Sequence, residues 1–124
     1  MPHTTVEYSA AVADTFERRG FAEDLHKTLT TTLGVRLTSC KTRFLRLDEE
    51  YLADGSPRYA LIHAEVALLS GRAPEVKREL AEAVLALLRR HAAPAPAVEV
   101  QFSVALRDLD RETYVKHDEP RVTA

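Results

Sequence analysis

The chain contains two segments with helical periodicity, and each lies between two segments that alternate like β-strands. In the first helical segment, apolar residues recur every four positions from Phe21 to Leu33, which predicts a helix over residues 13–33 that ends at Gly34. The second helix begins with Pro74 in its first turn and ends before Pro94, since proline cannot continue a helix. Its predicted buried stripe is Val76, Leu80, Val84, Leu87, Leu88 and His91.

Four segments have the alternation of strands, namely residues 2–8, 38–47, 59–69 and 98–106. Corresponding strands of the two halves lie roughly 57 residues apart, so the chain reads as a β-α-β unit followed by a second one. This order predicts an α/β fold, a two-layer sandwich in which two helices cover one face of a four-stranded sheet. The other face carries small and apolar groups beside polar ones, which favours self-association.

Size and charge narrow the class of protein. The chain has 124 residues and a mass of 13.9 kDa, which predicts one domain over residues 1–124 with a polar tail from about residue 111. A net charge of −2 gives no reason to expect a nucleic acid or an anionic membrane as a partner. No apolar run approaches the roughly 20 residues that span a bilayer.

The start of the chain and its cysteine content indicate a compartment. Residues 1–5 form neither a charged nor an apolar leader region, so we expect no signal peptide. Cys40 is the only cysteine, which excludes an intramolecular disulfide and suits a reducing compartment. We therefore expect a cytoplasmic protein.

Pro2 is the candidate for chemistry. Removal of Met1 would leave a secondary amine at the N-terminus, which can move protons if its surroundings keep it neutral near pH 7. While Met1 is present, the Pro2 nitrogen is an amide and cannot act as a base. Burial beside Lys41, Arg43 or Arg72 would disfavour the charged amine and lower its pKa.

Further positions, taken together with Pro2, resemble a known family. These positions are residues 2–9, Ala53-Asp54-Gly55, Tyr59-Ala60, His63 and Gly71-Arg72. On them the chain resembles the 5-carboxymethyl-2-hydroxymuconate isomerases of the tautomerase superfamily, to about residue 110. The resemblance implies a β-α-β repeat that assembles as a homotrimer.

The resemblance also implies cofactor-free keto–enol chemistry in the breakdown of aromatic compounds. Pro2 would take a proton from the hydroxyl of a 2-hydroxymuconate-type dienol di- or tricarboxylate and return one to carbon. Arg72 matches an arginine of the family that faces the substrate. Lys41 stands where the family has another arginine and lacks its planar two-point grip on a carboxylate. Arg43 lies on the same strand face as Lys41 and would assist it.

Two other functions stay open at this stage. Lys41 in place of arginine also fits a non-catalytic trimeric binding or scaffold protein on the same fold. It fits equally a tautomerase for a different small enol acid.

Metal, phosphate and thiol chemistry have little support in the sequence. The five histidines and Cys40 show no metal-ligand spacing, so we expect no metal and no cofactor. With four glycines, the chain has no phosphate-binding loop. We expect His63 to be a hydrogen-bonded histidine and Cys40 a buried structural thiol.

Overall fold

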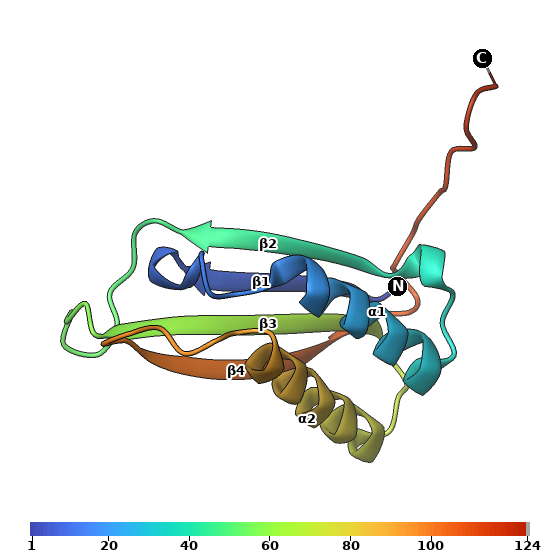
Figure 1. Cartoon of the computed structure of the whole chain (residues 1–124). Coiled ribbons are helices and arrows are strands. Elements are labelled where there is room, and N and C mark those ends of the chain that lie inside the picture. The colour runs from blue at the N-terminus through green and yellow to red at the C-terminus, as the bar shows by residue number, and fades with distance from the viewer. Residues whose placement is uncertain (124) are drawn as a thin grey trace.

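Four strands form one mixed sheet in the order β2-β1-β3-β4 (Figure 1). In this computed structural model, which describes residues 1–123, β1 and β2 run parallel, β3 and β4 run parallel, and β1 pairs antiparallel with β3. One helix connects each parallel pair, α1 (Arg18–Leu33) between β1 and β2 and α2 (Pro74–Arg90) between β3 and β4. The strands are β1 (His3–Ser9), β2 (Lys41–Leu47), β3 (Tyr59–Leu69) and β4 (Glu99–Leu109). The expected repeat of two β-α-β units is therefore confirmed.

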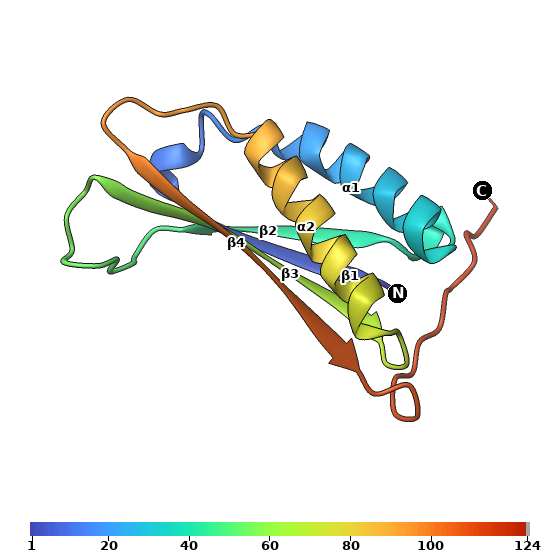
Figure 2. The ribbon, with the colours of Figure 1, turned by 90° about the horizontal axis from the view of Figure 1, so that it is seen from below.

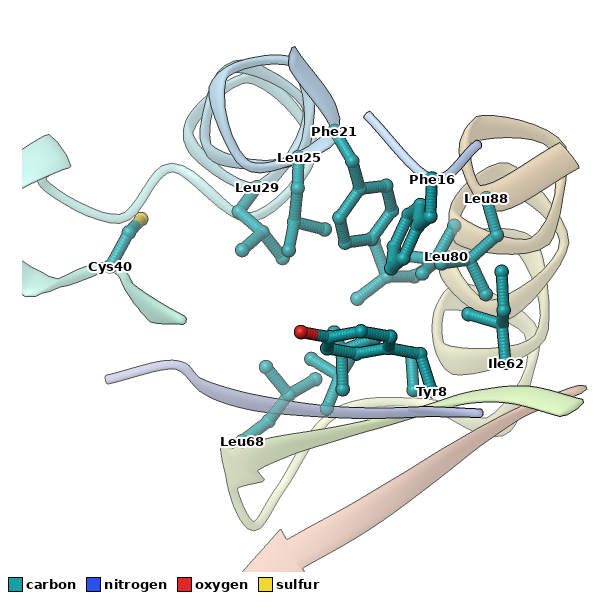
Figure 3. Packing of buried hydrophobic residues seen from close by; sticks show 14 of the residues in the cluster. Tyr8, Phe16, Phe21, Leu25, Leu29, Cys40, Ile62, Leu68, Leu80 and Leu88 are labelled. Carbon is teal, nitrogen blue, oxygen red and sulfur yellow. The ribbon is translucent and has the colours of Figure 1, made fainter. Parts of the chain in front are cut away.

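Both helices lie on the same side of the sheet, as Figure 2 shows. Alternate residues of β1 and β3 point into the layer between them, so Val6, Ile62 and Val66 are fully buried. The helices contribute side chains spaced three or four positions apart, which Figure 3 shows facing the sheet. These helical core residues are Phe21, Leu25, Leu29, Leu80, Val84 and Leu88. Within residues 1–123, the other face of the sheet carries no helix.

The expected start of the first helix at residue 13 is wrong. Ala10–Val12 form a 3₁₀ turn, and Phe16 makes an isolated β-bridge with Ala92 before α1 begins at Arg18. At this bridge the Glu17 N–H donates to the His91 carbonyl at 2.7 Å and the Thr15 carbonyl accepts from the Ala93 N–H at 3.0 Å, so these groups are paired outside the helix. The end of the helix is as predicted, because Gly34 takes the left-handed conformation with φ 68°.

The first strand lies one residue later than expected, and two other strands differ from the expected ranges by three residues at one end. The second begins at Lys41 rather than residue 38, because Leu37–Ser39 form a 3₁₀ turn. The fourth continues to Leu109, since β3 pairs with it as far as Leu69. In the stripe expected on α2, Val76, Leu87 and His91 are only half-buried.

The strand directions bring distant segments together at the two ends of the sheet. β1 and β2 begin at the end where β3 and β4 finish. We call this the proline end, because it holds Pro2 together with residues 33–41, 70–73 and 110–118. The opposite end, which we call the far end, holds residues 9–17, 48–58 and 91–98. Neither helix of residues 1–123 is long and apolar enough to cross a membrane.

Candidate active site

Pro2 is fully buried immediately before β1. Its carbonyl accepts a hydrogen bond of 3.1 Å from the backbone N–H of Lys41, which extends the pairing of β1 with β2 by one step. The amine of Met1 donates to the carbonyl of Ser39 at 3.1 Å. The first two residues are thus held against the start of β2.

Lys41 lies beside the start of the chain. Its Nζ donates to the same Ser39 carbonyl at 3.1 Å, so this ammonium and the amine of Met1 share one acceptor. Burial lowers the pKa of the Met1 amine, and the charges of Lys41 and Lys116 lower it further. An amine at this place is therefore biased toward its neutral form.

Arg72 reaches the same end of the sheet from the connection between β3 and α2. Its Nη1 donates to the carbonyl of Leu33, the last residue of α1, at 3.3 Å. Together with Arg111, it lines a hollow of about 120 Å³ beside Met1. The structure thus brings Pro2, Lys41 and Arg72 to one end of the sheet from three separate segments.

Arg43 occupies a different place, on the face of the sheet that no helix covers. Its Nη1 donates to Nδ1 of His3 at 3.1 Å, so a neutral His3 ring carries its hydrogen on Nε2 and donates it to the Tyr114 hydroxyl at 2.9 Å. Burial lowers the pKa of His3, and the charges of Arg43 and Lys41 add to this. These groups border a hollow of about 290 Å³ that is separate from the one at Arg72.

The segment after β4 adds residues that the sequence analysis did not select. Tyr114 and Lys116 line a second hollow beside Met1, of about 390 Å³, together with Arg36 and Val35. No local pattern pointed to them, because Tyr114 and Lys116 are more than a hundred positions from residue 1 in the sequence. Met1, Val35 and Leu69 border both hollows, of which one is lined by Arg72 and the other by Lys116.

The remaining candidates have structural contacts. His63 Nδ1 is 2.6 Å from the Ser103 hydroxyl, so its expected hydrogen bond is confirmed. Cys40 is buried, and burial raises the pKa of its thiol, which keeps it protonated. Among residues 1–123, no three His, Cys, Asp or Glu side chains gather in a group that could bind a metal. A larger hollow, of about 680 Å³ beside Phe16 and Arg18, lies at the far end.

The repeated β-α-β sandwich, with a buried proline at the start of β1 and cations around it, has the fold of the tautomerase superfamily. The family of 5-carboxymethyl-2-hydroxymuconate isomerases matches residues 2–121, and the chain belongs to this family of isomerases.

Solved structures agree with this fold. A 5-carboxymethyl-2-hydroxymuconate isomerase from Deinococcus radiodurans R1 is similar at 24% identity and a TM-score of 0.81, over 95% of this chain and 90% of that one. A 5-carboxymethyl-2-hydroxymuconate delta-isomerase has 18% identity and a TM-score of 0.78, over 96% and 89% of the two chains. A fused 4-OT wild-type symmetric trimer has 18% identity and a TM-score of 0.69, over 89% and 87%. No curated protein matches the chain.

Proposed function

We propose that this isomerase is a cofactor-free keto–enol tautomerase for a 2-hydroxymuconate-type dienol with two or three carboxylates. Its acid and base is the nitrogen of Pro2 after removal of Met1. The observation that carries the proposal is the position of Met1, which borders two cation-lined hollows and directly precedes a buried Pro2. Loss of Met1 would make the Pro2 nitrogen the N-terminal amine beside these hollows.

The surroundings of the N-terminus suit a base that works near neutral pH. Burial and the charge of Lys41 already lower the pKa of the Met1 amine. The same two effects would act on the amine of Pro2, the next residue. The neutral nitrogen takes the proton of the 2-hydroxyl group as the C=O bond forms and the double bonds shift. The resulting ammonium then gives its proton to the terminal carbon of the dienol, which yields the conjugated 2-oxo acid.

Cations at the proline end support binding of a carboxylated substrate. Arg72 offers a guanidinium with several donors, of which one is engaged with the carbonyl of Leu33. Lys41 adds a point charge beside the Met1 amine and would stabilise negative charge that develops on the enol oxygen. Arg43 is engaged with His3 on the uncovered face, so we assign it no direct contact with the substrate.

One observation favours a second candidate substrate class. A lysine ammonium holds a carboxylate at a single point, whereas an arginine holds it with two parallel hydrogen bonds. Lys41 therefore also suits a smaller enol acid with fewer carboxylates, such as a phenylpyruvate-like enol. Comparison of kcat/KM for the enols distinguishes the two candidates.

We propose that the protein acts as a homotrimer of single-domain protomers in the breakdown of aromatic compounds in the cytoplasm. The uncovered sheet face supports self-association, since it exposes Leu45 by 50% beside polar side chains. The similar fused 4-OT structure is a symmetric trimer. The single buried thiol, Cys40, suits a reducing compartment.

The test is ketonisation of 2-hydroxymuconate and its 5-carboxymethyl derivative, followed by ultraviolet absorbance, with protein whose intact mass lacks Met1. Pro2→Ala should lower kcat/KM by about 10²–10⁴-fold, the usual contribution of a positioned acid–base group. Protein that retains Met1 should be inactive, because its Pro2 nitrogen is an amide. Pro94→Ala changes an exposed loop proline and serves as the control. Unchanged turnover by the Pro2→Ala protein would reject the mechanism.

A further inference from the structure

The segment after β4, Asp110–Asp118, returns to the first residues of the chain. Arg111 donates to Ser70 twice, from its backbone N–H to the hydroxyl and from Nε to the carbonyl, both at 3.1 Å. Further along, the Tyr114 hydroxyl accepts the hydrogen bond from His3 at 2.9 Å. The segment is thus attached at the end of β3 and at the start of β1, and Figures 1 and 2 show it passing the N-terminus.

This attachment places a cation of the segment beside residue 1. Lys116 and Arg36 line the same hollow of about 390 Å³ that Met1 borders. Lys41 stands next to it, where it shares the carbonyl of Ser39 with the N-terminal amine. Two basic side chains from two segments therefore line one hollow at the proline end, and Lys41 lies beside the N-terminal amine that borders it.

A carboxylate already lies among these cations. The Oδ2 atom of Asp118 is 2.7 Å from Nζ of Lys116. The hydrogen bond from Lys116 lowers the pKa of Asp118, and the charges of Lys41 and Arg36 lower it further. The side chain of Asp118 is 80% exposed, so a pair of this kind contributes little to stability and a ligand carboxylate can displace it.

We propose that Lys116 binds the substrate carboxylate that is remote from the reacting enol, and that Asp118 pairs with Lys116 until that carboxylate displaces it. The inference rests on the proposed function, because it names the part of the substrate that the tail recognises. A diacid or triacid has at least one carboxylate more than a monoacid, and Lys41 and Arg72 alone would leave that additional carboxylate without a cationic partner. Lys116 provides that charge from the tail and makes the site select for polycarboxylates.

Equilibrium binding of two matched probes tests this without turnover. The first is trans,trans-muconate, a dienedioate that lacks the enol hydroxyl and cannot be ketonised. The second is sorbate, in which a methyl group replaces one carboxylate of muconate. Calorimetry on protein without Met1 should show muconate binding about 10-fold more tightly than sorbate, as expected for one additional charge-assisted contact.

Substitutions of the pair should act on muconate alone. Lys116→Met should lower the affinity for muconate to that for sorbate and leave the affinity for sorbate unchanged. Lys116→Arg should preserve the preference for muconate. Asp118→Asn removes the competing carboxylate and should tighten muconate by about 2- to 3-fold. Arg121→Met, a change of an exposed cation in the same tail, should alter neither probe.

The inference is overturned if wild-type protein does not prefer muconate, if it binds neither probe, or if Lys116→Met weakens both equally. Binding and ketonisation activity, measured together, distinguish failure of this inference from failure of the proposed function. A protein with the muconate preference and Lys116 dependence, but without any ketonisation activity, would reject the role of Pro2 alone. Full ketonisation without the preference would reject the role of Lys116 alone.

Discussion

The two ends of the sheet follow the same β-α-β plan, yet their connecting segments carry different chemistry. At the far end, aromatic rings pack against one another beneath the start of α1, with ring centroids 5.8 Å apart for Tyr8 and Phe16 and 5.9 Å for Phe16 and Phe21. Figure 3 shows these rings between the helices and the sheet. His91 pairs with Asp24 at 2.8 Å nearby. The contacts among these buried rings stabilise the fold, although a hollow of about 680 Å³ opens at the surface beside Phe16 and Arg18.

At the proline end, cationic side chains line two hollows that both border Met1. Arg72 and Arg111 line one hollow, and Arg36 and Lys116 line the other. Neighbouring cations repel one another, so this arrangement costs stability unless an anion binds there. The difference indicates a division of labour, in which packing at the far end supports a proline end that is preorganised for an anionic ligand.

The largest expected effect is on folding and lies at the far end. Phe21 is fully buried between Phe16 and Phe44, so Phe21→Ala should lower the free energy of unfolding by about 3–5 kcal/mol. Urea unfolding measures this, with Tyr51→Ala as a control in which an aromatic side chain that is 78% exposed is removed. The control should change stability by less than about 0.5 kcal/mol.

The activity of the Phe21→Ala protein tests whether the two ends of the sheet have separate roles. The folded fraction of the Phe21→Ala protein should keep its kcat/KM within about 3-fold, since Phe21 is remote from the hollows at Met1. A large loss of activity at full folding would show that the far end also shapes the site.

An opposite pattern is expected at the proline end. Arg72→Met should lower kcat/KM by about 10- to 100-fold, the value of one lost hydrogen-bonded contact to a charged group. The free energy of unfolding should change by less than about 1 kcal/mol, because Arg72 makes one hydrogen bond, to the carbonyl of Leu33. Arg72→Lys should retain part of the activity, since it keeps the charge and loses the fork.

Arg89→Met is the matched control for this measurement, because Arg89 is exposed in the last turn of α2. It should leave both kcat/KM and stability unchanged. Equal losses of activity in the Arg72 and Arg89 variants would point to overall charge rather than to a specific contact.

The local sequence pattern predicted the bounds of an element correctly where no contact distant in the sequence shifted those bounds. The range of β3, Tyr59–Leu69, and the start of α2 at Pro74 were predicted from alternation and from the fixed φ of proline. The start of α1 was not, because a β-bridge between Phe16 and Ala92 joins residues that are far apart in the sequence. β4 was predicted too short, since pairing with β3 carries it through Arg107 and Asp108 to Leu109.

For the candidate site too, the sequence predicted the residues marked by a local pattern or by the family resemblance, and missed those that only the fold brings together. Pro2, Lys41 and Arg72 could be selected because each lies at a position that the family resemblance marks, and all three lie at one end of the sheet. Lys116 could not, since only the fold of the tail brings it beside residue 1. Strand parity correctly placed Lys41 and Arg43 on one face of β2, but parity does not show that Arg43 turns to His3.

The smallest expected effect is a difference in how the two ends respond to acid. The pKa of His3, at the proline end, is lowered by burial first and then by Arg43 and Lys41. The unfolded chain therefore takes up this proton before the folded one does, and stability falls as the pH drops below about 6.5. His3→Gln should remove part of that loss, and the rest should persist because burial lowers the pKa of His26 in the same direction.

At the far end, the loss falls at lower pH. The hydrogen bond from His91 lowers the pKa of Asp24, so its stabilising contribution is complete above about pH 3.9 and disappears as the pH falls through the folded-state pKa. Asp24→Asn should therefore be less stable than wild type at pH 7 and pH 5, and the gap should narrow as the pH falls below about 3.9. Urea unfolding at pH 7, at pH 5 and below about pH 3.9 separates the two variants. If His3→Gln changed the pH dependence only below pH 4, or Asp24→Asn only above pH 5, the assignment of acid sensitivity to the two ends would be wrong.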